Sequence, residues 1–256
     1  MSNNHFPKKK KRQIWVVMTA TIAVCLIASL IVGAVFQNKS ATPSQEVKLD
    51  QKKSEQMAPG GKSQENTVSR INYTGQPMMG KKDAPVKIAE FGDYKCIYCH
   101  QFEMTIFPKL KKDFIDTGKV QYYFMNYTIV AQDSVKAANA AEAIFAMYPD
   151  RFWTFHHLLY KNQGPETESW VTDELLLKLA EEAVSHLDVS QFKDALEQGT
   201  YVNNIKTDVE MGQAAGVNGT PTIFINGKML SAQDTFDYSQ LRKAIQQAMG
   251  EKNNDQ

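Results

Sequence analysis

The pattern of apolar and polar positions divides the chain into a long apolar run, a polar stretch, and a region with the periodicities of a folded domain. Residues 14–36 contain no Asp, Glu, Lys or Arg and consist mainly of Ile, Val, Ala and Leu. At about 1.5 Å per residue, a helix of this length crosses the roughly 30 Å hydrocarbon core of a bilayer. We therefore expect one N-terminal transmembrane helix over residues 14–36.

An unbroken basic run at residues 8–12 precedes this apolar segment. Positive charge beside a membrane helix favours the cytoplasmic side. We therefore expect residues 1–13 to be cytoplasmic and everything after residue 36 to lie on the extracytoplasmic side of the cell membrane. A cleaved signal peptide is the alternative, although its apolar core usually has only about 7–15 residues. Both interpretations export the remainder of the chain.

The polar stretch 37–69 is rich in Lys, Gln, Ser, Asn and Glu, with few apolar side chains. Such a composition offers little apolar burial to offset chain entropy, so it predicts a flexible linker. We expect the folded domain to cover residues 70–250 and residues 251–256 to form a disordered tail.

Within the folded part, residues 86–91 and 120–127 have the β-branched and aromatic content typical of strands. Between them, apolar residues recur at every fourth position over 101–115, which predicts a helix that Pro108 kinks or interrupts. Thr172 is placed to cap a later helix. The further helices are expected at 133–147, 172–186, 190–198, 200–215 and 238–249.

The C-terminal part of the domain contains a hairpin signal. Asn226-Gly227 separates a strand at 222–225 from a return strand at 228–230, and this dipeptide favours a two-residue turn. The order of elements predicts an α/β fold in which a helical subdomain, at about residues 131–215, is inserted between two halves of one sheet.

The net charge and the cysteine content limit the classes of function that the chain can have. The formal net charge of +1 gives no global case for binding nucleic acid. Of the three cysteines, Cys25 falls in the apolar run, whereas Cys96 and Cys99 form a C-x-x-C pair after the first predicted strand. The chain is therefore not a disulfide-rich scaffold.

The position of the pair predicts reactive cysteines. Cys96 is expected to open a helix, where free backbone N–H groups and the helix dipole stabilise a thiolate. Cys99 follows almost one turn later on the same face, so it can attack a mixed disulfide formed at Cys96. We therefore expect Cys96 to be the exposed partner of substrates and Cys99 to be the more buried, resolving thiol.

Three other interpretations of the pair remain open. A permanent disulfide in so small a loop would constrain the unfolded chain little. A zinc site would need further ligands, and the remaining histidines show no second pair of recognisable spacing. With His100, the motif also satisfies the C-x-x-C-H pattern of covalent haem attachment.

Two longer stretches, 90–103 (EFGDYKCIYCHQFE) and 216–228 (GVNGTPTIFINGK), are similar to the DsbA-like branch of the thioredoxin superfamily, the bacterial envelope disulfide oxidases. The similarity extends over the whole folded part. It implies a thioredoxin fold with an inserted helical subdomain. One departure is Ile97, because proline commonly follows the first cysteine in envelope relatives.

The resemblance also implies roles for particular residues. Pro221 is expected to be cis, beside the cysteine pair, with the backbone of Thr220 available to a bound peptide. Glu90 matches a buried acid that exchanges protons with Cys99, and burial should raise its pKa. Glu103 also matches a family acid, but we expect it to be a solvated helix residue. From its position between the cysteines, Tyr98 is expected to add substrate contacts or packing contacts.

These points together predict a membrane-anchored, extracytoplasmic thiol-disulfide oxidoreductase, a protein disulfide oxidase that acts on exported proteins with cysteines. By analogy with the family, a quinone-linked membrane oxidoreductase would reoxidise it. The exchange itself needs no metal or organic cofactor. The alternatives are a reductase or isomerase of exported proteins, a haem electron carrier, and a redox-inactive binding module.

Overall fold

The computed structural model of the protein describes residues 71–254, with side chains up to residue 250. The expected cytoplasmic segment 1–13, membrane helix 14–36 and linker 37–69 lie outside the described residues. No helix within the described range has the length and apolar content needed to span a membrane.

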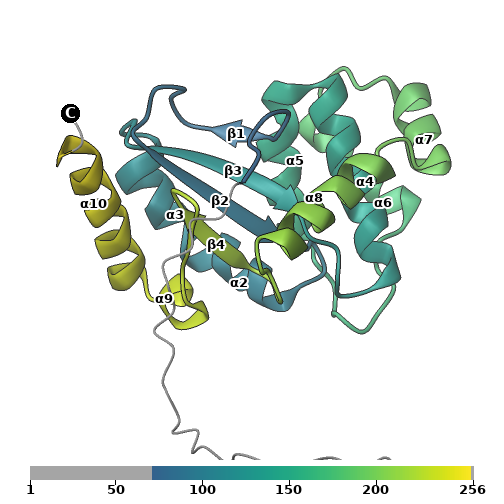
Figure 1. Ribbon diagram of the computed structural model, residues 1–256. Coiled ribbons are helices and arrows are strands. Elements are labelled where there is room, and N and C mark those ends of the chain that lie inside the picture. Colours follow the sequence, from purple (N-terminus) through teal and green to yellow (C-terminus); the bar gives the residue numbers. More distant parts are fainter. Residues whose placement is uncertain (1–70, 255–256) are drawn as a thin grey trace, which may run out of the picture. The chain divides into compact units, whose positions relative to one another are not determined.

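A single sheet of five strands forms the centre of the described domain (Figure 1). The strands are β1 (Met78–Met79), β2 (Val86–Gly92), β3 (Val120–Asn126), β4 (Thr222–Ile225) and β5 (Lys228–Met229), in the order β1-β3-β2-β4-β5. β2 and β3 are parallel, and the other three neighbouring pairs, β1 with β3, β2 with β4 and β4 with β5, are antiparallel. The predicted strands are confirmed, and β1 was not predicted.

Helices from both ends of the domain cover one face of this sheet. They are α2 (Ile97–Thr105), α3 (Phe107–Leu110) with the π-helix Lys111–Ile115 that follows it, and α10 (Tyr238–Asn254). Their apolar side chains form one cluster with those of β2, β3 and β4. The predicted interruption near Pro108 is confirmed, because α2 ends at Thr105 and Pro108 occupies the first turn of α3.

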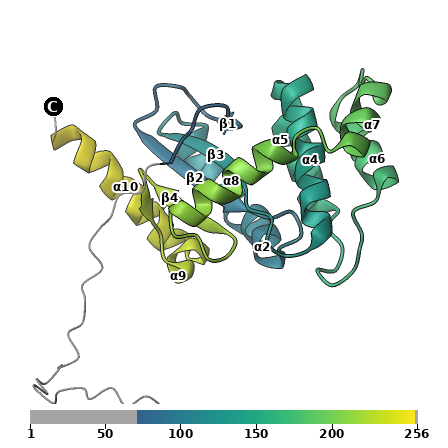
Figure 2. The same cartoon turned by 45° about the vertical axis from the view of Figure 1, so that its right-hand side comes forward.

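The insertion between β3 and β4 is a bundle of helices beside the sheet (Figure 2). Its last helix, α8, runs back toward β4. This confirms the predicted helical insertion. The bundle consists of α4 (Gln132–Met147), the 3₁₀ helix Pro149–Arg151, α5 (Phe152–Lys161), α6 (Asp173–Ala183), α7 (Val189–Gln198) and α8 (Val202–Ala214).

Capping and turn residues predicted some helix and strand boundaries correctly, whereas other boundaries differ from the prediction. The Thr172 hydroxyl accepts a hydrogen bond from the N–H of Leu175, as predicted for a cap, but the helix ends at Ala183 rather than near residue 186. Asn226 and Gly227 adopt φ of 48° and 79° and join β4 to β5, which confirms the hairpin. α10 continues to Asn254, through part of the expected tail. α5 and the short helix α9 (Ala232–Phe236) were not predicted.

Candidate active site

The turn from β2 to α2 presents the cysteine pair, and one buried carboxylate organises it. Asp93 accepts hydrogen bonds from the N–H of Lys95 at 2.8 Å and from the N–H groups of Ile129 and Val130 at 2.9 Å each. These bonds tie the turn to the loop that follows β3. The turn therefore has a fixed backbone before the first turn of α2 begins.

Cys96 is the N-cap residue of α2, as predicted, and Cys99 lies within that helix. Both are free thiols. The expectation that Cys96 is exposed is wrong, because only 4% of the residue is accessible. The cause is the loop before β4, since the carbonyl oxygen of Thr220 lies 3.2 Å from the sulfur of Cys96 and accepts a hydrogen bond from its protonated form. Cys99 is completely buried.

The two thiols have opposite acidities. A hydrogen bond from the Cys99 thiol, helped by the N–H groups of Cys99 and Tyr98 at the start of α2, outweighs burial and lowers the pKa of Cys96 to about 6. Burial and the neighbouring Cys96 raise the pKa of Cys99 well above its ordinary value. At neutral pH, Cys96 is therefore mostly thiolate and Cys99 is a thiol, as expected for an attacking and a resolving cysteine.

The loop over Cys96 has the expected cis peptide bond between Thr220 and Pro221. The hydroxyl of Thr222 donates to the carbonyl oxygen of Gly219 at 2.7 Å and closes the loop just before β4. The structure thus brings Thr220, Pro221 and Cys96 together from segments that are distant in sequence.

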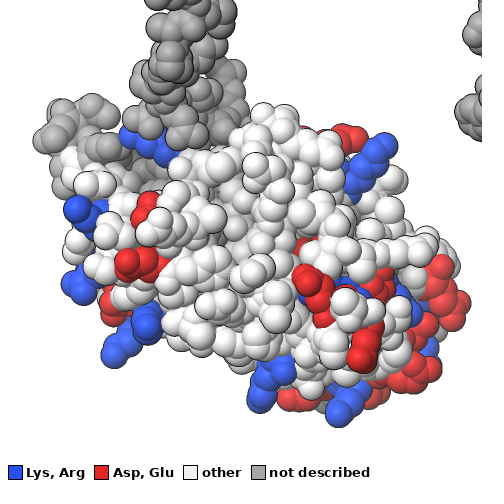
Figure 3. Space-filling view, turned by 90° about the horizontal axis from the view of Figure 1, so that it is seen from below, with Lys and Arg blue, Asp and Glu red and all other residues white. Residues whose placement is uncertain are grey.

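The two residues between the cysteines project from the surface. Ile97 is 56% exposed and Tyr98 is 59% exposed, and the ring of Tyr98 lies 6.2 Å from that of Phe236 in α9. α2 and α9 lie on the lower side of the view in Figure 1. Seen from below, this side has a wide uncharged area with its charged side chains toward the rim (Figure 3).

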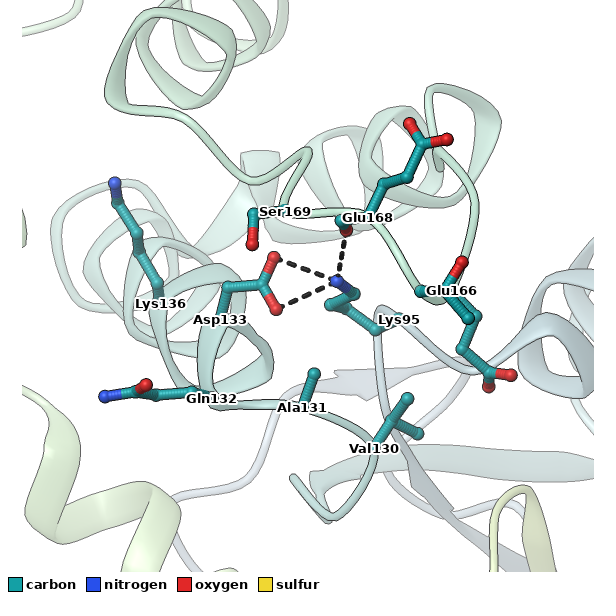
Figure 4. A pocket seen from close by; sticks show the side chains of 10 residues that line it. Lys95, Val130, Ala131, Gln132, Asp133, Lys136, Glu166, Glu168 and Ser169 are labelled. Atoms are coloured by element: carbon teal, nitrogen blue, oxygen red, sulfur yellow. Dashed lines mark hydrogen bonds and ion pairs between the residues drawn. The ribbon is translucent and has the colours of Figure 1, made fainter. Parts of the chain in front are cut away.

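Lys95 braces the other side of the turn (Figure 4). It is buried, and its ammonium group lies 2.9 Å from the carboxylate of Asp133 in α4 and 2.6 Å from the carbonyl oxygen of Glu168. These residues line a hollow of about 790 Å³, whose walls carry both acidic and basic side chains. Because Lys95 is fully paired, we interpret the hollow as a junction between the turn and the insertion.

Glu90 lies in the middle of β2, between Phe124 of β3 and Ile223 of β4, and is only 2% exposed. The hydroxyl of Tyr122 donates a hydrogen bond to its carboxylate. Burial is the main reason that the pKa of Glu90 rises to about 8, with Tyr122 opposing the shift and the charges of Glu103 and Cys96 adding to it. The structure therefore places Glu90 as a buried acid with a raised pKa, as the resemblance implied.

Glu103 is not a solvated helix residue, so that expectation is wrong. Only 3% of it is exposed, because α5 packs over α2 and covers it. One carboxylate oxygen accepts a hydrogen bond from Nδ1 of His157 at 2.9 Å, and the other lies 3.8 Å from Nε2 of His156. Burial raises the pKa of Glu103, but the two histidines outweigh burial and lower it.

Sequence reasoning also missed the histidines of α5. His156 and His157 were considered only as zinc ligands, and no helix was predicted at 152–161. A signal exists, since the buried side chains Phe152, Phe155, His156 and Leu159 follow helical spacing. No metal-binding cluster of His, Cys, Asp and Glu occurs in the described part of the chain.

Comparison with known proteins decides the family. The thioredoxin family model matches residues 72–247. The chain is 40% identical over 173 residues to the probable disulfide bond formation protein D of Bacillus anthracis, covering 68% of this chain and 78% of that protein. This chain belongs to the disulfide bond formation protein D family of the thioredoxin superfamily. The disulfide bond formation protein D of Bacillus subtilis (strain 168) is 37% identical over 175 residues, with 68% and 78% coverage.

Solved structures agree with this family. The crystal structure of oxidised BdbD from Bacillus subtilis aligns with a TM-score of 0.68 at 35% identity, covering 72% of this chain and 98% of that one. Chlamydia trachomatis DsbA, at 22% identity and a TM-score of 0.62, shows the same fold, covering 73% of this chain and 95% of that one. The predicted resemblance, the thioredoxin fold and the class of enzyme, a thiol-disulfide oxidoreductase, are confirmed.

Proposed function

We propose that this thiol-disulfide oxidoreductase works as an oxidase that donates the Cys96–Cys99 disulfide to exported proteins with cysteines. The observation that carries the direction is the position of Cys96 at the N-cap of α2 beside the Cys99 thiol, which lowers the pKa of Cys96 to about 6. A stabilised thiolate favours the reduced form of the pair, and this makes the disulfide a stronger oxidant. The low pKa also makes Cys96 a good leaving group when the substrate disulfide closes.

The proposed exchange has two steps. A substrate thiolate attacks the sulfur of Cys96, a mixed disulfide forms, and the bond between Cys96 and Cys99 breaks with its electron pair on Cys99. A second substrate thiolate then attacks the substrate sulfur of the mixed disulfide and expels Cys96 as a thiolate. The substrate loses two electrons, and the Cys96–Cys99 disulfide becomes a dithiol.

Glu90 is proposed to supply the proton that Cys99 needs when the pair opens. Burial is the main reason that the pKa of Cys99 lies well above its ordinary value, so the departing thiolate has to take up a proton. A carboxyl with a pKa of about 8 is close to the working pH, where general acid-base groups are most effective.

Substrate is proposed to bind along the loop over Cys96 and the first turn of α2. The backbone of Thr220, beside Pro221, would pair with an extended peptide, and the exposed ring of Tyr98 would contact its side chains. The uncharged area in Figure 3 suits a segment that is apolar and still unfolded.

We further propose that residues 14–36 anchor the protein in the cell membrane, with the domain on the extracytoplasmic side. The basic residues before the apolar run support this orientation. An oxidising compartment agrees with the oxidase direction. A quinone-linked membrane oxidoreductase is the proposed partner that restores the disulfide.

The reduction potential of the Cys96–Cys99 pair tests whether the protein works as an oxidase or as a reductase. The protein is equilibrated with reduced and oxidised glutathione, and the dithiol fraction is measured by alkylation. We expect a potential well above the value of about −270 mV for thioredoxin, together with mainly disulfide in untreated cells. A potential at or below that value, with mainly dithiol in cells, favours the reductase or isomerase alternative.

A substitution at Cys96 distinguishes a redox enzyme from a redox-inactive binding module. Cys96→Ser should abolish catalysed disulfide formation in a reduced protein, whereas Ser40→Ala should leave it unchanged. If Cys96→Ser keeps full function in cells, the chain acts as a redox-inactive binding module. A strong Soret band in the purified protein would support the haem alternative instead.

A further inference from the structure

The side chain of Gln163 reaches the cysteine turn from the helical insertion. Its Nε2 donates hydrogen bonds to the carbonyl oxygen of Tyr94 at 2.8 Å and to that of Cys96 at 3.1 Å. Gln163 lies two residues after the end of α5 and is partly buried. One amide group of the insertion therefore holds two carbonyl groups of the turn that carries the reactive sulfur.

Gln163 is itself held in place on both sides. Its backbone N–H donates to the carbonyl oxygen of Tyr160 at 3.1 Å, and the same oxygen lies 2.8 Å from Nδ1 of His100 in α2. A Cβ atom at Gly164 would lie only 2.7 Å from Cγ of Trp170, so glycine is needed for this close approach. The end of α5 and the start of α2 are thus joined in both directions, and the amide of Gln163 has a fixed position.

The first turn of α2 has no side-chain cap of its own. No side chain bonds its free N–H groups, and the turn contains no acidic residue. The N–H groups of Tyr98 and Cys99 instead bond the sulfur of Cys96. The carbonyl oxygen of Cys96 accepts the N–H of His100 at 3.1 Å and also the amide of Gln163. The direction of the N–H groups therefore depends on backbone that Gln163 holds from outside the helix.

We propose that Gln163 is a positioning residue for disulfide exchange, which holds the first turn of α2 so that its N–H groups stay directed at the sulfur of Cys96. This inference rests on the proposed exchange through Cys96 and Cys99, and it holds for either direction of that exchange. The sulfur of Cys96 carries a charge only in the dithiol form. The two hydrogen bonds of Gln163 should therefore stabilise the dithiol form more than the disulfide form.

The test compares Gln163→Met, which keeps the length of the side chain but donates no hydrogen bond, with Gln198→Met at an exposed position in α7. Full-length reduced protein is alkylated with iodoacetamide over a range of pH, and mass spectrometry of the Cys96 peptide gives the midpoint. An ordinary hydrogen bond changes an equilibrium constant by about threefold to tenfold. We expect the midpoint to rise by about half a pH unit to one unit in Gln163→Met and to stay unchanged in Gln198→Met.

The equilibrium with glutathione gives a second measurement on the same variants. The dithiol is favoured less when its thiolate is stabilised less, so Gln163→Met should shift the equilibrium toward the disulfide by about threefold to tenfold. Urea unfolding should show a larger loss of stability in the reduced form of Gln163→Met than in its oxidised form. Cys99 and Glu90, the titratable groups that interact with Cys96, are the same in all these proteins.

Two further substitutions at Gln163 separate positioning by a donor from packing alone. Gln163→Glu has the same length but sets carboxylate oxygens against the two carbonyl groups, so its midpoint should rise further than that of Gln163→Met. Gln163→Lys restores an N–H donor, and its midpoint should return to that of the unaltered protein or below it. If packing alone mattered, the midpoints would not follow this order.

The inference is wrong if Gln163→Met and Gln163→Glu match Gln198→Met in both the midpoint and the glutathione equilibrium, even when they unfold at lower urea concentration. Disulfide exchange by the unaltered protein would then still stand. If the unaltered protein itself exchanges no disulfide with glutathione, the proposed function fails and Gln163 has no reactive sulfur to position.

Discussion

The acidity of Cys96 depends most on a single neighbour, the thiol of Cys99. The hydrogen bond from that thiol is the largest cause that lowers the pKa of Cys96 to about 6. Cys99→Ala removes the donor, so the pKa of Cys96 should rise toward about 8.5, the value of a free thiol. The rate of alkylation by iodoacetamide as a function of pH measures this change.

Cys99→Ser is the control for that experiment, because its hydroxyl occupies the same position and still donates. The midpoint of its profile should stay close to that of the unaltered protein. An unchanged midpoint in Cys99→Ala would show that the N–H groups at the start of α2 hold the thiolate without Cys99.

Glu90 should make the fold less stable as the pH rises. Its pKa is about 8 in the folded protein and about 4.3 when unfolded, so the folded state binds more protons between these values. The free energy of unfolding therefore falls as pH increases through this window, by at most about 1.4 kcal/mol per pH unit. Glu90→Gln keeps an acceptor for Tyr122 and removes this dependence.

Urea unfolding of the reduced protein at pH 5 and pH 8 measures the difference. Glu142 and Asp208 are also buried acids with raised pKa values, about 7 and 6, but they are present in both proteins and cancel in the comparison. Equal losses of stability in Glu90→Gln and the unaltered protein would contradict a buried, protonated Glu90.

Among the elements, the turn before α2 is held to the insertion by the ion pair of Lys95 and Asp133. Lys95→Met leaves a mostly buried carboxylate without its partner. Removal of one member of a buried pair costs about 3–5 kcal/mol, and the 17% exposure of Asp133 favours the lower end of that range. The free energy of unfolding in urea checks the loss.

The double variant Lys95→Met with Asp133→Leu is the control, since it removes both charges together. It should regain much of the lost stability, because an apolar replacement for both members of a buried pair is often neutral. A single variant as stable as the unaltered protein would mean that the pair contributes nothing to holding the turn.

The same elements show what the sequence could and could not predict. β2, β3 and the hairpin were found because apolar runs and Asn226-Gly227 are local signals. α5 was not predicted. The burial of Glu103 was therefore not predicted either, because α5 is the helix that packs over Glu103. β1 has only two residues, too few for any period to appear.

For the whole molecule, the sequence predicted the thioredoxin fold and the approach of the loop at Thr220 and Pro221 to the cysteine pair through resemblance. It did not predict that this loop covers Cys96, because the covering contact joins segments 124 residues apart. The burial of Cys96 follows from tertiary packing, as does the partnership of Glu103 with the histidines. Features that depend on neighbouring residues in the sequence could be predicted, whereas contacts between distant elements could not.

The state of the cysteine pair should change the stability of the entire domain. The pKa of Cys96 is lower in the folded dithiol form than in an unfolded chain, so this group adds stability at high pH and loses it as pH falls through about 6. The disulfide form has no thiolate. After allowance for solvent screening, we expect the dithiol form to gain about 1 kcal/mol over the disulfide form between pH 5 and pH 7.

Urea unfolding of the oxidised and the reduced protein at pH 5, 7 and 9 measures this gain, and the difference should grow further by pH 9. Glu90 is present in both forms, so its opposite dependence largely cancels. Cys96→Ser has no thiolate at this position, and its stability should lack the rise that the reduced protein shows relative to the oxidised one. A difference that stays constant or shrinks with pH would mean that the folded domain does not stabilise the thiolate, and the argument for an oxidising disulfide would lose its basis.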